Sequence, residues 1–286
     1  MASLKEIRGR ISSIQSTRKI TSAMKMVSAS KLKRAQQAVE NYIPYMEQLT
    51  GIADSFVDTK DEALLPVTEE RALQNVAIVA FASNGSLCGA FNSNVLKKLQ
   101  EMMNEYRGEV PQCHITIYAI GKKVADWANK NNISYKVPSA DLTEKPSYQT
   151  AADIADKLTT HFREKKFDKI EIVYNHFKNA AVQQIRRETL LPIAPMESKG
   201  TNIDYIVEPT RAELINVLIP KLLRLQVYGA LLDSIASEHG ARTTAMQMAT
   251  ENADQLVQDL NLQYNKMRQG AITKELLDII GGSAVA

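Results

Sequence analysis

A ladder of hydrophobic residues with seven-residue spacing runs through the C-terminal part of the chain. Seven of its eight positions are apolar, and the members are Leu218, Leu225, Leu232, His239, Met246, Ala253, Leu260 and Met267. A strict seven-residue repeat keeps one stripe on one side of a helix, as in the seam of a left-handed coiled coil. No proline follows Pro220, so residues 221–280 can form a rod of roughly 90 Å at ~1.5 Å per residue. We predict a coiled-coil helix that needs a partner, against the alternative of an ordinary amphipathic bundle helix.

The predicted partner is a second helix at the N-terminus. Apolar residues follow three- and four-residue spacing from Leu4 to Ile14, the phase then slips, and the stripe continues from Ile20 to Leu49. Pro44 and Pro220 each remove one backbone hydrogen bond, so we expect each to kink or locally break its helix. Two long terminal helices therefore flank a middle segment.

The middle segment has a different periodicity, with short buried strands alternating with helices. The predicted strands are 74–81, 114–120, 133–137, 170–177 and 182–191, and the predicted helices are 90–106, 121–131 and 148–166. Such alternation favours a parallel sheet. The predicted fold class is α/β plus long α, in which an antiparallel coiled coil of the N- and C-terminal helices carries an inserted Rossmann-like α/β domain.

Linker signals give the domain boundaries. Residues 58–70, with Pro66 and many charges, are the expected entry linker, and residues 192–209, with Pro195 and Gly200, are the expected exit. Thr210 and Glu213 have the spacing of a capping box that starts the second long helix. We therefore divide the chain into the N-terminal helix 1–58, the α/β domain with its linkers 59–209, and the C-terminal helix 210–286.

Positive charge is concentrated on the first helix. The chain has a net charge of +3, but residues 1–39 contain nine basic residues against Glu6 alone, which is +8, so the remainder carries −5. Such asymmetry indicates an acidic partner, and nucleic acid, anionic lipid or an acidic protein surface all qualify. The simpler interpretation is a solvated helix face. The composition, 44% hydrophobic and 23% charged, is that of a soluble globular protein.

Cysteine usage and hydropathy indicate the compartment. Cys88 and Cys113 have no metal or redox spacing, so we expect free thiols in a reducing environment. No uninterrupted apolar run approaches the ~20 residues that span a bilayer, and the N-terminus lacks a secretory signal. A transit peptide is the alternative, but the hydrophobic stripe begins at Leu4 and runs directly into the helix. We expect a protein that is cytosolic or peripheral to a membrane.

The evidence for catalytic chemistry in the sequence is weak. The segment 83–89 (SNGSLCG) follows a strand and precedes a helix, where backbone N–H groups can hold phosphate, yet it matches neither glycine-rich nucleotide motif. Cys88 and His114 are a conceivable nucleophile and base. The histidines show no ligand spacing on a shared helix face; they are His114, His161, His176 and His239. We therefore predict no catalytic residues, no cofactor and no metal.

Several motifs match one known family. They are Lys5-Glu-Ile-Arg, Thr17-Arg-Lys-Ile-Thr, Ala23-Met-Lys-Met-Val-Ser-Ala-Ser-Lys31, Gln226-Val-Tyr-Gly-Ala-Leu-Leu, Ser237-Glu-His-Gly-Ala-Arg242, Tyr264-Asn-Lys-Met-Arg-Gln269, Ile272-Thr-Lys-Glu275 and Cys88-Gly-Ala-Phe-Asn-Ser-Asn-Val. Through them the whole chain resembles the gamma subunit of the rotary (F-type) ATP synthase, in its bacterial form. Where that family usually has Asp-Arg-Gly or Asp-Lys-Gly, this chain has Asn84-Gly85-Ser86, which removes both charges. The paired-cysteine insertion of chloroplast relatives is missing, so we do not expect thiol switching.

The resemblance implies a rotor and not an enzyme. In that family the terminal helices form an asymmetric antiparallel shaft inside a ring of alternating alpha and beta subunits. The α/β domain binds the epsilon subunit and sits on the membrane rotor ring. Rotation of the shaft imposes different conformations on the catalytic sites of the beta subunits, so that proton transport is coupled to ATP synthesis. The implied location is the cytoplasmic face of the bacterial inner membrane, as a peripheral subunit.

The resemblance also assigns contact residues. Those implied for the beta catch and sleeve are Met24, Arg242, Arg268, Gln269, Thr273 and Glu275; those for the beta lever are Arg8, Arg34 and Cys88; and Tyr205 belongs to the foot that meets epsilon and the rotor ring. Neither nucleic acid nor a small-molecule substrate is an implied partner. Two alternatives remain at this stage, a coiled-coil nucleic-acid-binding protein and a nucleotide-dependent α/β enzyme.

Overall fold

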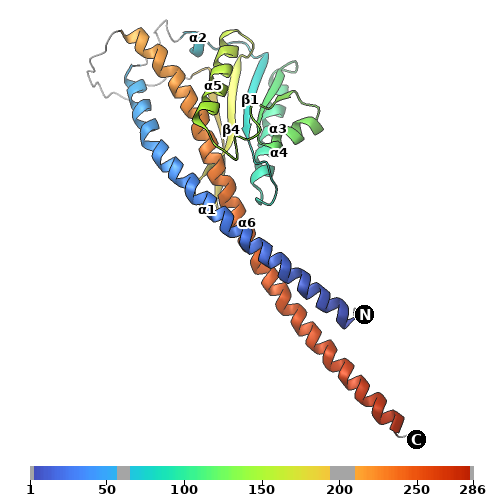
Figure 1. Ribbon diagram of the computed structural model, residues 1–286. Helices are drawn as coiled ribbons and strands as arrows, with labels where there is room; N and C mark the ends of the chain where they lie inside the picture. Colours follow the sequence, from blue (N-terminus) through green and yellow to red (C-terminus); the bar gives the residue numbers. More distant parts are fainter. Residues whose placement is uncertain (1–2, 57–64, 194–209, 284–286) are drawn as a thin grey trace. The chain divides into compact units, whose positions relative to one another are not determined.

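The computed structural model describes residues 3–56, 65–193 and 210–283 (Figure 1). Two long helices, α1 (Leu4–Phe56) and α6 (Arg211–Ser283), flank an α/β segment in the sequence. By their contacts the residues form two compact units, Met1–Ser28 with Thr243–Ala286, and Ala29–Arg242. Each unit is described by itself. The predicted division at residues 58 and 209 stays a prediction, and Tyr205 lies outside the described residues.

The second unit is built around a five-stranded sheet. Its strands are β1 (Asn75–Phe81), β2 (His114–Ile120), β3 (Tyr135–Lys136), β4 (Lys169–Phe177) and β5 (Gln183–Leu191), in the order β3-β2-β1-β4-β5. The first four strands pair in parallel, as predicted. β5 departs from this pattern and runs antiparallel to β4, because the short connection between them forms a hairpin and leaves no room for a crossover helix. Asn179 fixes the hairpin by accepting hydrogen bonds from Ala181 N and Val182 N.

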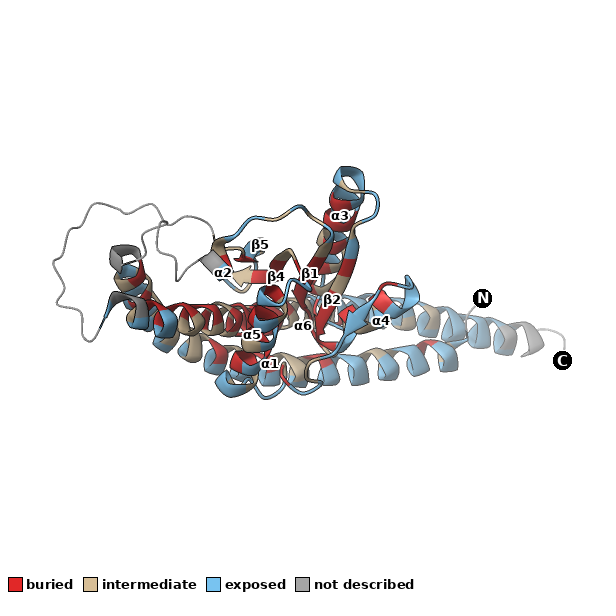
Figure 2. Cartoon of the chain, turned by 90° about the horizontal axis from the view of Figure 1, so that it is seen from above, coloured by how far each residue is buried: buried red, intermediate tan, exposed pale blue. Residues whose placement is uncertain are grey.

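Helices cover both faces of the sheet. The side chains of β1 alternate, with Val76 and Ile78 in one hydrophobic cluster and Ala77 and Val79 in the other. The first cluster includes residues of α3 (Phe91–Glu109) and α4 (Lys122–Lys130), and the second includes residues of α5 (Tyr148–Arg163), α1 and α6. Figure 2 shows the resulting band of buried residues along the strands. Burial on both faces explains why β1 reads as an unbroken apolar run.

Within the second unit, α1 and α6 pack through the predicted ladder. Leu218, Leu225 and Leu232 are buried, and the first two belong to the hydrophobic cluster that joins α1, α6 and the sheet. The Tyr42 hydroxyl donates to Leu225 O across 2.8 Å. A Cβ atom on Gly229 would lie only 2.6 Å from Tyr42 Cζ, so the absence of a side chain at this position permits the close approach.

Neither proline interrupts its helix. α1 continues through Pro44 and α6 continues through Pro220, so the local breaks that we expected are wrong. Pro44 is exposed, where water can satisfy the carbonyl that loses its partner. Around Pro220, the buried side chains of Ile219 and Leu222 hold the helix in place by packing.

In the first unit the same two helices form an antiparallel pair. Ladder residues Met246 and Ala253 are buried, and Leu260 and Met267 are half-buried. Three polar contacts fix the register: Thr21 Oγ1 lies 2.8 Å from Thr250 Oγ1, Lys25 Nζ donates to Gln247 Oε1 across 2.8 Å, and Arg18 pairs with Asp254 across 2.7 Å. Because residue numbers rise on one helix while they fall on the other, the predicted antiparallel coiled coil is confirmed.

The segments next to the long helices are partly described. Glu213 N donates to Thr210 Oγ1 across 3.3 Å, which confirms the predicted capping role of Thr210. Pro66 lies in a short helix, α2 (Leu65–Thr68), so the expected entry linker contains regular structure. Residues 58–64 and 194–209 of the two expected linkers lie outside the described residues.

By length and composition, α6 contains a stretch apolar enough to cross a membrane. Half of this stretch is buried inside the protein, and its apolar ladder residues, such as Leu225, contribute to the core of the second unit. A core helix of this kind passes the same test as a membrane-spanning helix. We therefore interpret the stretch as a core helix.

Candidate functional site

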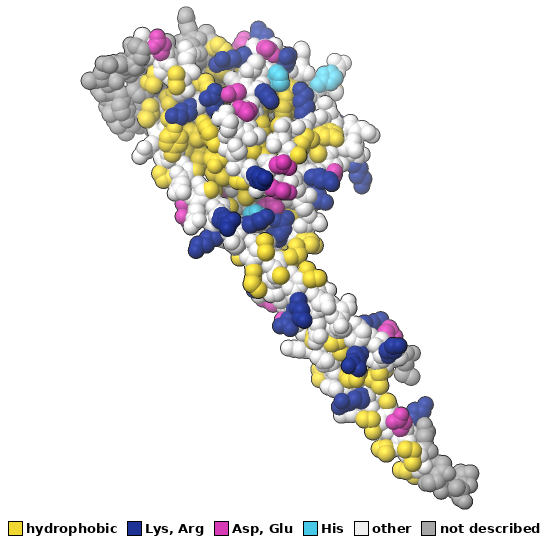
Figure 3. Space-filling view, viewed as in Figure 1, with side chains coloured by type: hydrophobic (Ala, Val, Ile, Leu, Met, Phe, Trp, Pro, Cys, Tyr) yellow, Lys and Arg dark blue, Asp and Glu magenta, His cyan; other side chains and the backbone are white. Residues whose placement is uncertain are grey.

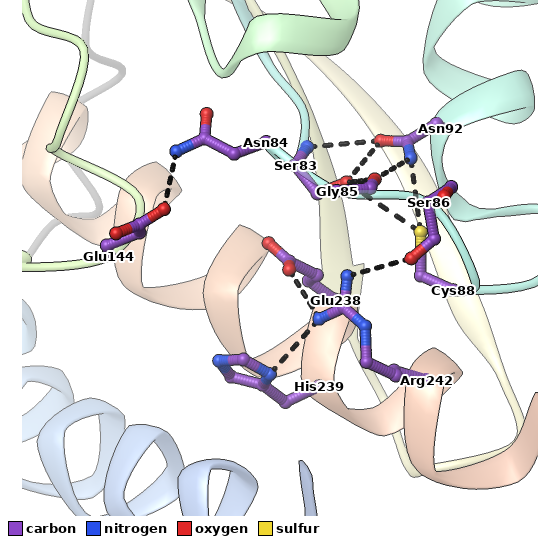
Figure 4. Close-up of polar contacts among 10 residues, drawn as sticks. All are labelled: Ser83, Asn84, Gly85, Ser86, Cys88, Asn92, Glu144, Glu238, His239 and Arg242. Carbon is purple, nitrogen blue, oxygen red and sulfur yellow. Dashed lines mark hydrogen bonds and ion pairs between the residues drawn. The ribbon is translucent and has the colours of Figure 1, made fainter. Parts of the chain in front are cut away.

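The candidate site is the loop between β1 and α3, together with the part of α6 that it contacts (Figure 4). The side chain of Asn92, in the first turn of α3, forms hydrogen bonds with the backbone of this loop. Asn92 Oδ1 accepts from Ser83 N across 3.1 Å, and Asn92 Nδ2 donates to Gly85 O across 3.1 Å. The Ser83 hydroxyl also lies 2.6 Å from Gly85 O. Together these hydrogen bonds fix the loop backbone. The sequence analysis did not identify Asn92, although an amide side chain that follows a loop is a frequent hydrogen-bond partner of the loop backbone.

The tip of the loop has an unusual backbone conformation. Leu87 has φ +66° and Gly89 has φ +57°. A positive φ is ordinary for glycine but uncommon for leucine. Leu87 is also 56% exposed, so the loop presents a large apolar side chain from a backbone that is held in an unfavourable region.

Asn84 anchors the other side of the loop. Its Oδ1 accepts from Lys122 N across 3.0 Å at the start of α4, and its Nδ2 donates to Glu144 Oε1 across 3.2 Å. Gly85, the next residue, lies beside Arg242, since a Cβ there would be 3.7 Å from Arg242 Nη2. The departure Asn84-Gly85-Ser86 therefore keeps a polar anchor in its first position and leaves space for Arg242 in its second.

Arg242 of α6 reaches the loop from a nearly buried ion pair. Its Nη1 donates to Glu238 Oε1 across 2.6 Å, and the two side chains are only 13% and 11% exposed. Its Nη2 donates to Ser86 O at the long distance of 3.5 Å. The ion pair holds the guanidinium at the loop, so Arg242 links α6 to the segment that follows β1.

Burial also shifts the titration of the neighbouring groups. Desolvation raises the pKa of Glu238 above its ordinary value, and the attraction of Arg242 offsets only part of this effect. Desolvation, with Arg242 and Lys31 as further causes, lowers the pKa of His239 to about 4. His239 is therefore neutral at pH 7 and occupies its ladder position as an uncharged side chain.

Two further contacts tie β4 to α6. Asp233 accepts from Phe177 N across 2.9 Å, and its second oxygen lies 2.5 Å from His176 Nδ1. Ser237 donates to Asn175 O across 2.9 Å. These contacts place Asp233, Ser237 and Arg242 on α6 opposite the carboxyl ends of β4 and β1. Sequence patterns do not reveal this pairing, because the partners are more than fifty residues apart.

The structure brings together only some of the residues implied by the resemblance. Arg34, Cys88 and Arg242 belong to the second unit, and the others that are described belong to the first: Arg8, Met24, Arg268, Gln269, Thr273 and Glu275. Arg34 is exposed, but Cys88 is only 1% exposed and its Sγ lies 3.1 Å from Asn92 Nδ2. In the first unit Met24 is half-buried, and the remaining five side chains are exposed.

The proposed pairing of Cys88 with His114 is wrong. His114 starts β2 and pairs with Asn75 at the amino end of the parallel strands. Cys88 follows the carboxyl end of β1, seven residues beyond Phe81. The length of a strand therefore separates the two side chains, roughly 20 Å at ~3.3 Å per residue. Among residues 3–56, 65–193 and 210–283, no group of acidic, histidine or cysteine side chains has an arrangement that would hold a metal ion.

Comparisons with known proteins define the class. A sequence model described as ATP synthase matches residues 3–285. The fold resembles a chain of the mitochondrial ATP synthase of Euglena gracilis, with a TM-score of 0.66 at 22% identity over 99% of this chain and 94% of that one. A chain from the central stalk and c-ring structure of the Tetrahymena thermophila enzyme gives a TM-score of 0.55 at 25% identity, over 80% of this chain and 99% of that one.

Relatives with higher sequence identity specify the family. The ATP synthase gamma chain of Phocaeicola vulgatus is 48% identical, and that of Bacteroides fragilis is 50% identical, each over 99% of both chains. The chain belongs to the ATP synthase gamma chain family. This confirms the resemblance and the fold class predicted from the sequence. It also identifies a peripheral, non-catalytic subunit of a membrane-bound complex.

Proposed function

We propose that the chain is the central-stalk rotor subunit of a proton-driven ATP synthase, which transmits rotation of a membrane ring to the catalytic sites on the beta subunits. The observation that carries this proposal is the apolar surface at the end of α6 in the first unit. The side chains there are between 49% and 68% exposed: Ile272, Leu276, Leu277, Ile279 and Ile280. Apolar surface of this extent indicates a protein partner.

A surrounding sleeve accounts for this surface. The seam of the first unit uses Met246 and Ala253 of α6, whereas the side chains near the end of the helix point in several directions. Figure 3 shows hydrophobic and basic side chains interspersed on the exposed surface of the helix pair. A ring of alpha and beta subunits would cover such a surface on all sides. Contacts made by exposed basic side chains are worth only ~0–1 kcal/mol each, so they guide the shaft without locking it.

Asymmetry of the helix pair supplies the coupling. α6 has 73 residues and α1 has 53, and the two helices differ in sequence. The two sides of the shaft therefore present different side chains to the surrounding subunits. A shaft with three-fold symmetry would stabilise all three catalytic sites equally. An asymmetric shaft stabilises one conformation at one site and another conformation at the next, and the conformational populations shift as it turns.

The partners follow from this role. The Euglena structure contains F1 and the c-ring, and the Tetrahymena structure contains the central stalk and the c-ring. For this chain we propose alpha, beta and epsilon subunits and a membrane rotor ring as partners, at the cytoplasmic face of a bacterial inner membrane. Tyr205 remains the proposed foot residue.

The contact residues divide between two regions. In the first unit, we propose that Arg268, Gln269, Thr273, Glu275 and Met24 contact the beta catch and sleeve and that Arg8 contacts an acidic lever. In the second unit, the proposed contacts are Arg34, Arg242 and the loop that contains Cys88. Since the Cys88 thiol is buried, the loop would meet a partner through exposed neighbours such as Leu87.

Co-purification with functional measurement tests the proposal. The full chain, expressed together with alpha, beta and epsilon subunits, should purify as one complex and should make ATP turnover in membranes sensitive to the proton gradient. Omission of the chain should abolish that coupling. A chain that never co-purifies with alpha and beta subunits, or a complex whose turnover is coupled equally well without it, would contradict the proposal.

A further inference from the structure

A cleft of about 500 Å³ lies within the second unit, and the rotor function does not use it as a whole. Its lining includes Lys31, Arg34 and Ala38 of α1 and, from the segment before α5, Thr143 and Glu144. α6 contributes further residues, and Figure 4 shows Asn84 directed toward Glu144, with Glu238, His239 and Arg242 on α6. This volume is within the range of small-molecule sites.

The cleft carries a net positive charge. Lys31 and Arg34 are exposed, and neither makes a hydrogen bond or ion pair within the described ranges 3–56, 65–193 and 210–283, although Lys31 attracts the carboxylate of Glu238. Arg242 is already neutralised by Glu238 at 2.6 Å. His239 is buried and neutral at pH 7. The single unpaired negative charge of the lining is Glu144, which accepts a hydrogen bond from Asn84. The three basic side chains of the lining, Lys31, Arg34 and Arg242, outnumber its two carboxylates, Glu144 and Glu238, and this excess of positive charge favours an anionic ligand.

A second property of the lining restricts the kind of anion. The remaining lining includes Ala38, Leu232 and Ile235, which form an apolar surface. Apolar walls with a few polar groups are typical of sites that bind an amphipathic small molecule.

We propose that this cleft binds a small amphipathic anion, with a phosphate or carboxylate group at Lys31 and Arg34 and an apolar body against Leu232 and Ile235. The inference is independent of the rotor function, because it depends on the second unit alone. It has one consequence for that function. Arg34 is a proposed lever contact, so an anion in the cleft would compete with an acidic partner for the same guanidinium.

The test is a titration of the isolated full chain with phenyl phosphate, which has an anionic group and an apolar body, followed by methyl NMR. Resonances of Leu232 and Ile235 should shift and saturate, whereas those of Leu262 and Ile272 in the first unit should not move. Inorganic phosphate, which lacks the apolar body, should bind at least roughly tenfold more weakly. Phenyl phosphate and benzoate would distinguish a phosphate site from a carboxylate site.

Variants locate the site. Lys31→Gln with Arg34→Gln should weaken phenyl phosphate binding at least roughly tenfold by removing both cations. The matched control is Lys19→Gln with Lys33→Gln, which removes the same charge from the same helix outside the cleft lining and should bind as the parent chain does. Lys31 and Arg34 are exposed, so circular dichroism should show intact folding. Equal binding by both double variants, or no saturable shift of Leu232 and Ile235, would overturn the proposal.

Discussion

Arg242 and Glu238 form an ion pair one helical turn apart on α6, with Nη1 2.6 Å from Oε1 and both side chains nearly buried. The pair fixes the charge environment of His239, which occupies the same turn and a position in the hydrophobic ladder. Because Arg242 and Lys31 add to the effect of burial, a proton on His239 is disfavoured in the folded chain. Acid therefore acts against folding at this point.

We predict that His239 makes the folded chain lose stability as the pH falls from 6.5 to 4. In this window the unfolded chain binds a proton at His239 and the folded chain does not, since its pKa is lowered to about 4. His239→Leu removes this contribution to the pH dependence. Between pH 7 and pH 4, the free energy of unfolding of the parent should therefore fall by roughly 2 kcal/mol relative to that of the variant, after allowance for solvent screening. Urea unfolding at both pH values measures the difference.

His114→Gln is the control for that experiment, because His114 is exposed at the start of β2. Glu238 acts in the opposite direction. Because its pKa is raised, Glu238 binds a proton more tightly in the folded chain than in the unfolded chain. Its contribution therefore lowers the free energy of unfolding as the pH rises above 4.5. Comparing His239→Leu with the parent cancels the Glu238 term. A pH dependence that is the same in both chains would contradict the assignment to His239.

A second prediction concerns the contact between Gly229 and Tyr42. A Cβ at Gly229 would lie 2.6 Å from Tyr42 Cζ, so Gly229→Ala should destabilise the chain by roughly 1–3 kcal/mol in spite of the better helix propensity of alanine. The same substitution at Gly9, where no atom lies within 4 Å of the added Cβ, should be neutral or stabilise by up to ~1 kcal/mol. Chemical unfolding of both variants checks the contrast.

The crowding at Gly229 also predicts a coupling. In a chain with Tyr42→Leu, the added methyl group meets a smaller side chain, so Gly229→Ala should cost less than in the parent. The coupling free energy from this double-mutant cycle should be roughly 1 kcal/mol or more. A cost that is unchanged by Tyr42→Leu would show that the two residues do not limit each other.

The sequence predicted the elements because each has a strong period of its own. The ladder from Leu218 to Met267 identifies the buried side of α6, and the unbroken apolar run of β1 identifies a strand covered on both faces. The antiparallel direction of β5 was not predicted. It depends on the hairpin at Asn179, and strand composition does not report direction.

The site was predicted less well than the fold. The resemblance supplied Arg242, but neither periodicity nor composition links it to Ser86, which is 156 residues away in sequence. The same holds for Asn92, whose side chain supports the loop, and for Asp233, which holds the end of β4. Sequence patterns record local spacing and burial, whereas these contacts depend on how β1, β4 and α6 meet in three dimensions. Burial of Cys88 is likewise a result of packing, here against Phe91 and Ala241.

A third prediction tests the proposed catch. Arg268 and Gln269 are exposed on α6, and the fork-shaped guanidinium suits an acidic or polar loop of a partner. Arg268→Ala with Gln269→Ala should lower the yield of assembled complex or its coupled ATP turnover by roughly threefold or more. Gln263→Ala with Lys274→Ala is the control, because these exposed residues lie on another side of the same helix. Unchanged yield and turnover in the first variant would defeat the proposed catch.

The last prediction concerns the end of α6, where the described chain provides little cover. Leu262 is 69% exposed, Leu277 is 63% exposed and Ile279 is 68% exposed, so this stretch should open readily in the isolated chain. Binding that requires the folded state stabilises it by mass action. Amide hydrogen exchange of residues 256–280 should therefore slow at least roughly tenfold when alpha and beta subunits are added. Peptides from β1, buried in the second unit, should exchange equally slowly in both samples. If the isolated chain already protects residues 256–280 as strongly as the complex does, its own helix pairing stabilises the shaft and a sleeve is not required.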